Sequence, residues 1–259
     1  MAVVSSYSLD GRVAIVTGAS SGIGEATARH LAASGLEVAL VARRKERLES
    51  VRSEIVGAGG RASAFEEDLA DTDAPARLIE RVLAECGRLD VIVNNAASFR
   101  LKAVEEFTLA EFDDHVAVNL RAPYFLVQAA LPALRASPAA VVVNVSSAAA
   151  VMYRSGQTVY GMTKAGIEHL TMNLAAELAP DRIRFVGVRP GPVATEIHLA
   201  VSDPEARKQE LGRLVPLGRI GRPEEIATWI GHLVAEDAEW VTGTVITVDG
   251  GRILGPPGV

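Results

Sequence analysis

Three residues whose types and spacing could do chemistry lie in the second half of the chain: Ser147, Tyr160 and Lys164. A Tyr and a Lys that are four residues apart on a helix lie on the same face, so the ammonium group can approach the phenol. A phenol has an ordinary pKa of about 10, and a nearby cation lowers that pKa toward neutral pH. A Ser hydroxyl can donate to a carbonyl oxygen, or to the alkoxide that forms from it. Together the three residues predict an acid/base site that interconverts a carbonyl and an alcohol.

The spacing of the Tyr and the Lys is weak evidence by itself, because a packed aromatic residue and a solvated lysine would give the same pattern. A second motif, near the N-terminus, supports the prediction. Its glycines let the backbone turn tightly and approach a pyrophosphate, which the free N–H groups at the start of a helix can bind. Their spacing departs from G-x-G-x-x-G, but the place between a predicted strand and a predicted helix indicates a dinucleotide site. The motif reads Thr17-Gly18-Ala19-Ser20-Ser21-Gly22-Ile23-Gly24.

The end of the second predicted strand indicates which dinucleotide binds. It carries Arg43 and Arg44 and no carboxylate, since Glu37 lies at the other end of the strand and Glu46 lies a helical turn further on. An acid at this place suits the ribose hydroxyls of NAD(H), whereas Arg can pair with the 2′-phosphate of NADP(H). We predict NADP(H), with Arg43 as the main contact and Arg44 stacking or assisting. The alternative is that both arginines are solvated at the start of a helix.

Short apolar runs alternate with longer amphipathic segments along the whole chain. This alternation predicts an α/β fold, a Rossmann-type, doubly wound parallel sheet of about seven strands with helices on both faces. We expect one dinucleotide-binding and catalytic domain over 1–259, with a substrate-binding loop region at about 191–222. The predicted strands are Val13–Thr17, Val38–Ala42, Ala62–Phe65, Val91–Asn94, Val141–Ser146, Ile183–Val188 and Val245–Val248. The predicted helices are Gly22–Ser34, Lys45–Gly57, Pro75–Cys86, Leu109–Arg135, Val159–Leu178 and Pro223–Ala235.

Composition excludes several classes of function. The 259 residues are 49% hydrophobic and 22% charged, with a net charge of −6 and no basic block, which argues against nucleic acid or an anionic membrane as a partner. Cys86 is the only cysteine and the five His residues show no metal-ligand spacing, so we predict no disulfide and no metal site. Met1–Leu9 shows no features of a signal peptide, and no apolar run reaches the roughly 20 residues of a membrane span. We expect a soluble, cytoplasmic protein.

The glycine motif, Ser147, Tyr160 and Lys164 in one chain resemble the short-chain dehydrogenase/reductase family, most closely its 3-oxoacyl-acyl-carrier-protein reductase-like branch. The resemblance runs from Leu9 to about Arg252. It implies that Asn119 is a fourth catalytic residue, which holds a water that links Lys164 to solvent.

The same resemblance implies further contacts with the cofactor. Asp68 and Leu69 would contact the adenine, and Pro190, Gly191, Val193 and Thr195 would clamp the nicotinamide. Asn95 and Ala96 lie in a segment that resembles the family's N-N-A-G, with Ala97 in place of the last Gly. The family often has an Asn shortly before the Pro-Gly pair, where this chain has Phe185-Val186-Gly187.

The leading hypothesis is an NADP(H)-dependent reductase of a small-molecule or carrier-bound carbonyl compound. The alternatives are an NAD-dependent alcohol dehydrogenase, a dinucleotide-binding regulator without turnover, and a sugar-nucleotide epimerase or dehydratase, whose longer substrate domain is absent here. The identity of the substrate stays open: four basic residues could attract an acidic or carrier-bound substrate, or could simply be solvated. The four basic residues are Arg154, Arg207, Lys208 and Arg213.

The two longest predicted helices carry apolar residues on more than one face, which predicts a homo-oligomer, a tetramer first and a dimer second.

Overall fold

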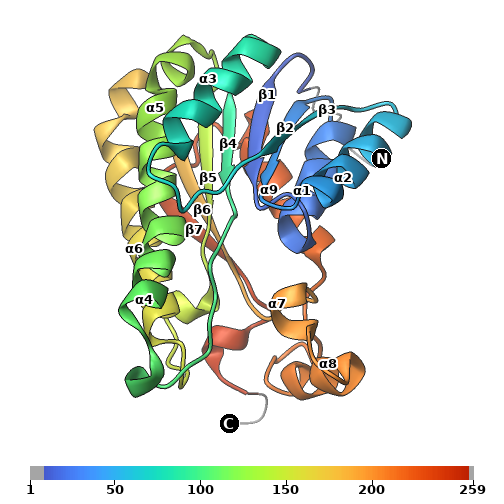
Figure 1. Ribbon diagram of the computed structural model, residues 1–259, viewed down its shortest axis with the longest axis vertical. Coiled ribbons are helices and arrows are strands. Elements are labelled where there is room, and N and C mark those ends of the chain that lie inside the picture. Colours follow the sequence, from blue (N-terminus) through green and yellow to red (C-terminus); the bar gives the residue numbers. More distant parts are fainter. Residues whose placement is uncertain (1–8, 257–259) are drawn as a thin grey trace.

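The computed structural model describes residues 9–256 (Figure 1). Within them, seven strands form one parallel sheet in the order β3-β2-β1-β4-β5-β6-β7, which confirms the predicted fold class. The prediction about a signal peptide concerns Met1–Leu9, of which residues 1–8 lie outside this range. The strands are β1 Val13–Thr17, β2 Glu37–Ala42, β3 Arg61–Glu66, β4 Val91–Asn94, β5 Val141–Val145, β6 Arg184–Pro190 and β7 Thr244–Val248.

The central strands are apolar on both sides because helices cover both faces of the sheet. Every residue of β1, β4 and β5 is buried, as expected for strands of a covered parallel sheet. One core joins the sheet to α1 (Gly22–Ala33), α2 (Lys45–Gly57) and α9 (Pro223–Val234). The other joins it to α3 (Ala74–Cys86), α5 (Ala122–Ala136) and α6 (Thr158–Glu177), on the opposite face (Figure 1).

Strands β1 to β3 extend the sheet in one direction, and β4 to β7 extend it in the other. The strand order therefore reverses between β1 and β4, which pair through Val16 and Val93. Ligands of doubly wound folds bind in the crevice at such a point, beyond the carboxyl ends of the strands. The glycine-rich turn follows β1 at this edge, and the segments that follow β4, β5 and β6 emerge beside it. The topology therefore gathers the predicted functional residues at one edge.

Two predicted elements were wrong. The single helix expected over Leu109–Arg135 is divided into α4 (Leu109–Val116), a π-helical turn (Ala117–Arg121) and α5. The stretch 191–222, expected to be irregular, contains α7 (Glu196–Leu199) and α8 (Pro204–Gly212). α8 begins where the side chain of Asp203 accepts a hydrogen bond of 2.9 Å from the backbone N–H of Ala206, a normal helix cap that precedes a Pro.

Within residues 9–256, no helix is both long enough and apolar enough to span a membrane.

Candidate active site

The glycine-rich turn owes its shape to positions where a side chain would not fit. Gly18 and Gly22 have φ angles of +68° and +58°, which favour glycine. A Cβ on Gly24 would lie 2.3 Å from the carbonyl oxygen of Gly18, so the start of α1 packs directly on the turn. Ser20, Ser21 and Ile23 fill the positions between these glycines. The free N–H groups at the start of α1 can therefore face a bound phosphate.

Asn95 and Ala96 hold this turn from the neighbouring strand. The amide of Asn95 donates to the carbonyl oxygen of Thr17 over 2.9 Å, and the N–H of Ala96 donates to the Thr17 hydroxyl over 3.0 Å. The predicted N-N-A segment thus supports the glycine-rich turn through Thr17.

The two arginines after β2 point in different directions. Arg44 donates to the hydroxyls of Ser20 and Ser21 over 3.0 and 2.7 Å. Arg43 is exposed and makes no hydrogen bond or ion pair within residues 9–256. The geometry therefore favours Arg44 as the side chain that faces the phosphate end of the turn.

Glu196, on α7, is an unforeseen partner of these basic residues. Its carboxylate accepts from Arg44 over 2.9 Å and also pairs with Arg47. Both arginines lower the pKa of Glu196. A cavity of about 540 Å³ lies here, between α1, α2 and α7. Glu196 would compete with a 2′-phosphate for Arg44.

The predicted adenine-contacting residues follow β3 at the same edge of the sheet. Asp68 is exposed, and its carboxylate accepts the N–H of Ala70 over 3.0 Å. Leu69 is buried against the helices of the neighbouring face. Asp68 is thus available to a ligand, while Leu69 anchors the segment.

Ser147, Tyr160 and Lys164 come together where β5 meets α6. Ser147 lies two residues beyond β5, and Tyr160 and Lys164 lie one turn apart near the start of α6. The hydroxyl of Ser147 lies close enough to that of Tyr160 to influence its pKa. The ring of Phe99 packs edge-on against that of Tyr160, with 4.9 Å between centroids.

The close approach of these elements depends on Gly161, which sequence reasoning missed. A Cβ there would lie 2.7 Å from the carbonyl oxygen of Ala149, in the short helical turn that follows Ser147. A glycine next to the Tyr of the predicted pair was the available signal.

The Lys164 ammonium is buried beside the Tyr160 ring, 5.7 Å from its centroid. It donates to the carbonyl oxygen of Val145 over 2.8 Å. Burial lowers the pKa of Lys164 to about 8. Burial also raises the pKa of Tyr160 to about 12, although the nearby Ser147 hydroxyl acts in the opposite direction. Burial is thus the largest influence on the Tyr160 pKa and moves it away from neutral pH, contrary to the prediction that Lys164 brings it toward neutral pH.

Asn119 lies in the π-helical turn and is buried. Its side-chain oxygen accepts the N–H of Ser98 over 2.8 Å, and its amide donates to the carbonyl oxygen of Ser98 and the hydroxyl of Thr163 over 3.0 Å each. Thr163 in turn donates to the carbonyl oxygen of Tyr160 over 2.8 Å. Asn119 thus connects the segment after β4 to α6, and π-helical turns often mark functional sites.

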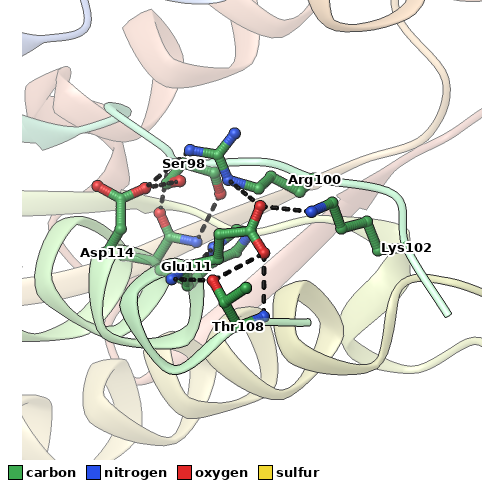
Figure 2. A network of polar contacts seen from close by, with 8 residues as sticks. Ser98, Arg100, Lys102, Thr108, Glu111 and Asp114 are labelled. Atoms are coloured by element: carbon green, nitrogen blue, oxygen red, sulfur yellow. Dashed lines mark hydrogen bonds and ion pairs between the residues drawn. The ribbon is translucent and has the colours of Figure 1, made fainter. Parts of the chain in front are cut away.

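A polar network continues from Asn119 to α4 (Figure 2). The hydroxyl of Ser98 donates to Asp114, and Lys102 pairs with Glu111 over 2.6 Å. Arg100 lies between both acids, within 3.9 Å of each. The network fixes the segment 98–102 against α4, next to the Phe99 ring that contacts Tyr160. No pattern in the sequence indicates these partners.

The segment after β6 lies over the glycine-rich turn. A Cβ on Gly22 would lie 2.9 Å from the methyl group of Thr195. Pro190 ends β6, Gly191 packs against Asp249, and Val193 is buried. The predicted nicotinamide clamp and the predicted phosphate-binding turn are therefore in contact.

Comparison with known proteins defines the class of this protein. A family model described as Enoyl-(Acyl carrier protein) reductase matches residues 18–252. The chain belongs to the short-chain dehydrogenase/reductase family of oxidoreductases, as the sequence predicted, and resembles the 3-oxoacyl-acyl-carrier-protein reductase branch.

Among its relatives, the 3-oxoacyl-acyl-carrier-protein reductase FabG of Thermotoga maritima is 35% identical over 95% of this chain and 99% of its own. A short-chain dehydrogenase/reductase of Serratia marcescens has a TM-score of 0.89 at 34% identity, with 95% of this chain and 100% of that chain covered. The angucycline C-6 ketoreductase LanV, solved with bound NADP, also has a TM-score of 0.89 at 34% identity, with 96% and 98% covered.

Proposed function

We propose that this protein is an NADP(H)-dependent ketoreductase, which interconverts a ketone and a secondary alcohol and works in the direction of reduction. The observation that carries the proposal is the meeting of Ser147, Tyr160 and Lys164 beside a glycine-rich turn of dinucleotide-binding shape. Similarity to LanV and to FabG supports it.

The cofactor would be held by the residues that surround the turn. Its phosphates would lie against the start of α1, its adenine near Asp68, and its nicotinamide near Val193 and Thr195. NADPH bound there supplies the hydride. These residues fit a dinucleotide because the glycines allow close approach of the backbone and Arg44 lies beside Ser20 and Ser21.

The chain itself contributes orientation and a proton. Ser147 donates to the carbonyl oxygen and so stabilises the negative charge that forms on it. Tyr160 gives its phenolic proton to the same oxygen. Lys164 supplies positive charge next to the phenol that has lost its proton, and would hold the ribose hydroxyls of the cofactor. Asn119 holds α6 and the segment after β4 in place, so that protons can reach Lys164.

The test of this function follows the oxidation of NADPH over a panel of ketones, β-keto thioesters and one enoyl thioester. Turnover of a carbonyl compound supports the proposal. Tight binding of NADPH with no turnover favours the regulator, and turnover with NADH alone favours an NAD-dependent dehydrogenase. If only the enoyl thioester is reduced, the protein is a reductase of carbon–carbon double bonds and the ketoreductase proposal is wrong.

Replacing Arg44 by Ala is expected to lower kcat/KM for NADPH by roughly 10- to 100-fold and to leave the value for NADH unchanged. A hydrogen-bonded charge pair with the 2′-phosphate contributes about 1.5–3 kcal/mol, and each 1.4 kcal/mol is about tenfold. Steady-state kinetics with both cofactors measures the effect. Arg43→Ala is the matched control, and a larger loss in that variant would restore Arg43 as the main phosphate contact.

We also propose a cytoplasmic homo-oligomer, a tetramer before a dimer. The helices α4, α5 and α6 expose apolar side chains that a single sheet leaves uncovered: Leu109 (75% exposed), Tyr124, Phe125, Met162 and Met172. Such surface favours burial against a second copy. Light scattering after size exclusion should give four times the chain mass of 27.3 kDa. Replacing Phe125 by Glu should lower the measured mass, and a monomeric native protein would contradict the proposal.

A further inference from the structure

Three neighbouring parallel strands, β5, β6 and β7, end at the same edge of the sheet, and each is followed by a segment that carries an arginine. Arg154 follows β5, in the stretch between Ser147 and Tyr160. Arg207 follows β6, on α8, and Arg252 follows β7 at the start of a short helical turn. Figure 1 shows α7, α8 and the short red helical turn that follows β7 beyond this edge.

The C-terminal turn is fixed against the segment that follows α8. The N–H of Leu217 donates to the carbonyl oxygen of Gly250 over 3.2 Å. A Cβ on Gly251 would lie 3.0 Å from the ring of Pro216. The carboxylate of Asp249 accepts the N–H groups of Gly251 and Ile253 over 2.8 Å each. Arg252 is therefore held on an ordered turn.

Arg154, Arg207 and Arg252 form a cluster in which positive charge exceeds negative charge. Arg154 and Arg252 are half-buried, and within residues 9–256 neither side chain makes a hydrogen bond or an ion pair. Arg207 pairs with Glu210 over 2.6 Å, but Glu210 is largely exposed. Burial and the charges of Arg207 and Arg252 lower the pKa of Arg154. Half-buried cations that repel one another are unfavourable unless an anion lies between them.

His198, on α7, completes the cluster and adds a group that can donate without adding charge. Burial and the charges of Arg154 and Arg207 lower its pKa to about 4. It is therefore neutral at pH 7 and can offer one ring N–H to an anionic oxygen. Other basic residues of 191–222 differ from this cluster: Arg219 pairs with Glu225 over 2.6 Å, Lys208 pairs with Glu205 over 2.5 Å, and Arg213 is exposed.

We propose that Arg154 and Arg252, assisted by Arg207 and His198, bind an anionic group of the substrate, a carboxylate or a phosphate ester. The inference rests on the proposed ketoreductase function and specifies its substrate class: a ketone that carries such a group at a distance from the carbonyl. Arg is suited to this role because its planar guanidinium can bind two oxygens of a carboxylate or phosphate. Because Arg154 belongs to the segment that joins Ser147 to α6, an anion bound there orients the ketone toward Tyr160.

Matched pairs of ketones test the site. One pair is 5-oxohexanoate and its methyl ester, and the other is the phosphate ester of 5-hydroxy-2-pentanone and the free alcohol. We expect kcat/KM to favour the anionic member of at least one pair by about 10- to 100-fold. Arg154→Gln should remove that preference, mainly through KM, and leave the neutral member within about twofold. The matched control is Arg213→Gln, since Arg213 is an exposed arginine just after α8, outside the cluster.

A binding measurement separates this proposal from the function on which it rests. Calorimetry with the protein saturated in NADP⁺ needs no turnover and uses the same two anionic ketones. Binding that is lost in Arg154→Gln and kept in Arg213→Gln supports the site, and the pair with the stronger preference tells carboxylate from phosphate. If neither anion binds, or if Arg154→Gln affects charged and neutral ketones equally, the anion site is wrong. Absence of turnover for every ketone despite binding of the anions would overturn the ketoreductase function and leave the site standing.

Discussion

Tyr160→Phe is expected to lower kcat for ketone reduction by about 10³-fold while the Kd for NADPH stays within about twofold, because a positioned proton donor contributes about 10²–10⁴-fold. The variant keeps the ring that packs 4.9 Å from Phe99 and removes only the hydroxyl beside Ser147. Stopped-flow or steady-state oxidation of NADPH gives the rate, and fluorescence titration gives the affinity. The control is Tyr153→Phe, a 91% exposed tyrosine in the same segment, which should keep the native rate.

The raised pKa of Tyr160 sets the direction of the pH dependence. A phenol with a pKa of about 12 is protonated throughout the neutral range, so reduction, which consumes its proton, should be flat with pH near 7. Oxidation of the alcohol needs the phenolate, so its rate should rise with pH.

A Tyr160→Phe protein that retains more than a tenth of the native rate of reduction would show that another group supplies the proton.

The sequence predicts the sheet well because its signal is local. The runs around Val91–Asn94 and Val141–Val145 are almost wholly apolar, which is typical of strands in a parallel sheet that helices cover on both faces. Ser147, Tyr160 and Lys164 could be placed together for the same reason, since the order of the elements brings the end of β5 and the start of α6 to one edge. These predictions need no knowledge of side-chain contacts between distant residues.

Predictions that depend on such contacts were incomplete. The sequence alone does not indicate whether Arg43 or Arg44 points toward Ser20. The direction of Arg44 depends on its ion pair with Glu196, a residue on α7 that lies far away in the sequence. The π-helical turn at Asn119 depends on its hydrogen bonds with Ser98, 21 residues away in the sequence. The pKa of Lys164 depends on how completely the fold buries it, and composition does not report burial.

Lys164→Met is expected to lower kcat/KM by at least about 10²-fold and, at pH 7, to raise the free energy of unfolding by about 2 kcal/mol. Lys164 is 3% exposed, and its pKa falls from 10.5 to about 8 on folding. Each pKa unit corresponds to about 1.4 kcal/mol, so the charged form destabilises the fold by about 3 kcal/mol below pH 8. Removing the buried charge should therefore stabilise the fold by about 3 kcal/mol, and losing the hydrogen bond to Val145 should offset about 1 kcal/mol of this stabilisation.

The pH dependence of stability gives a second readout of the same substitution. Between about pH 8 and 10.5 the unfolded chain holds a proton on Lys164 that the folded chain has released, so this residue makes native stability rise with pH. Tyr160 acts in the opposite direction, but only above pH 10, where the unfolded chain loses its phenolic proton first. Urea unfolding at pH 7 and pH 9.5 should show the rise in the native protein and its absence in Lys164→Met. The control is Lys45→Met, an exposed lysine at the start of α2, which should change stability by less than about 0.5 kcal/mol. A Lys164→Met protein that is less stable than the native one at pH 7 would mean that the buried ammonium group holds the fold together as well as serving the chemistry.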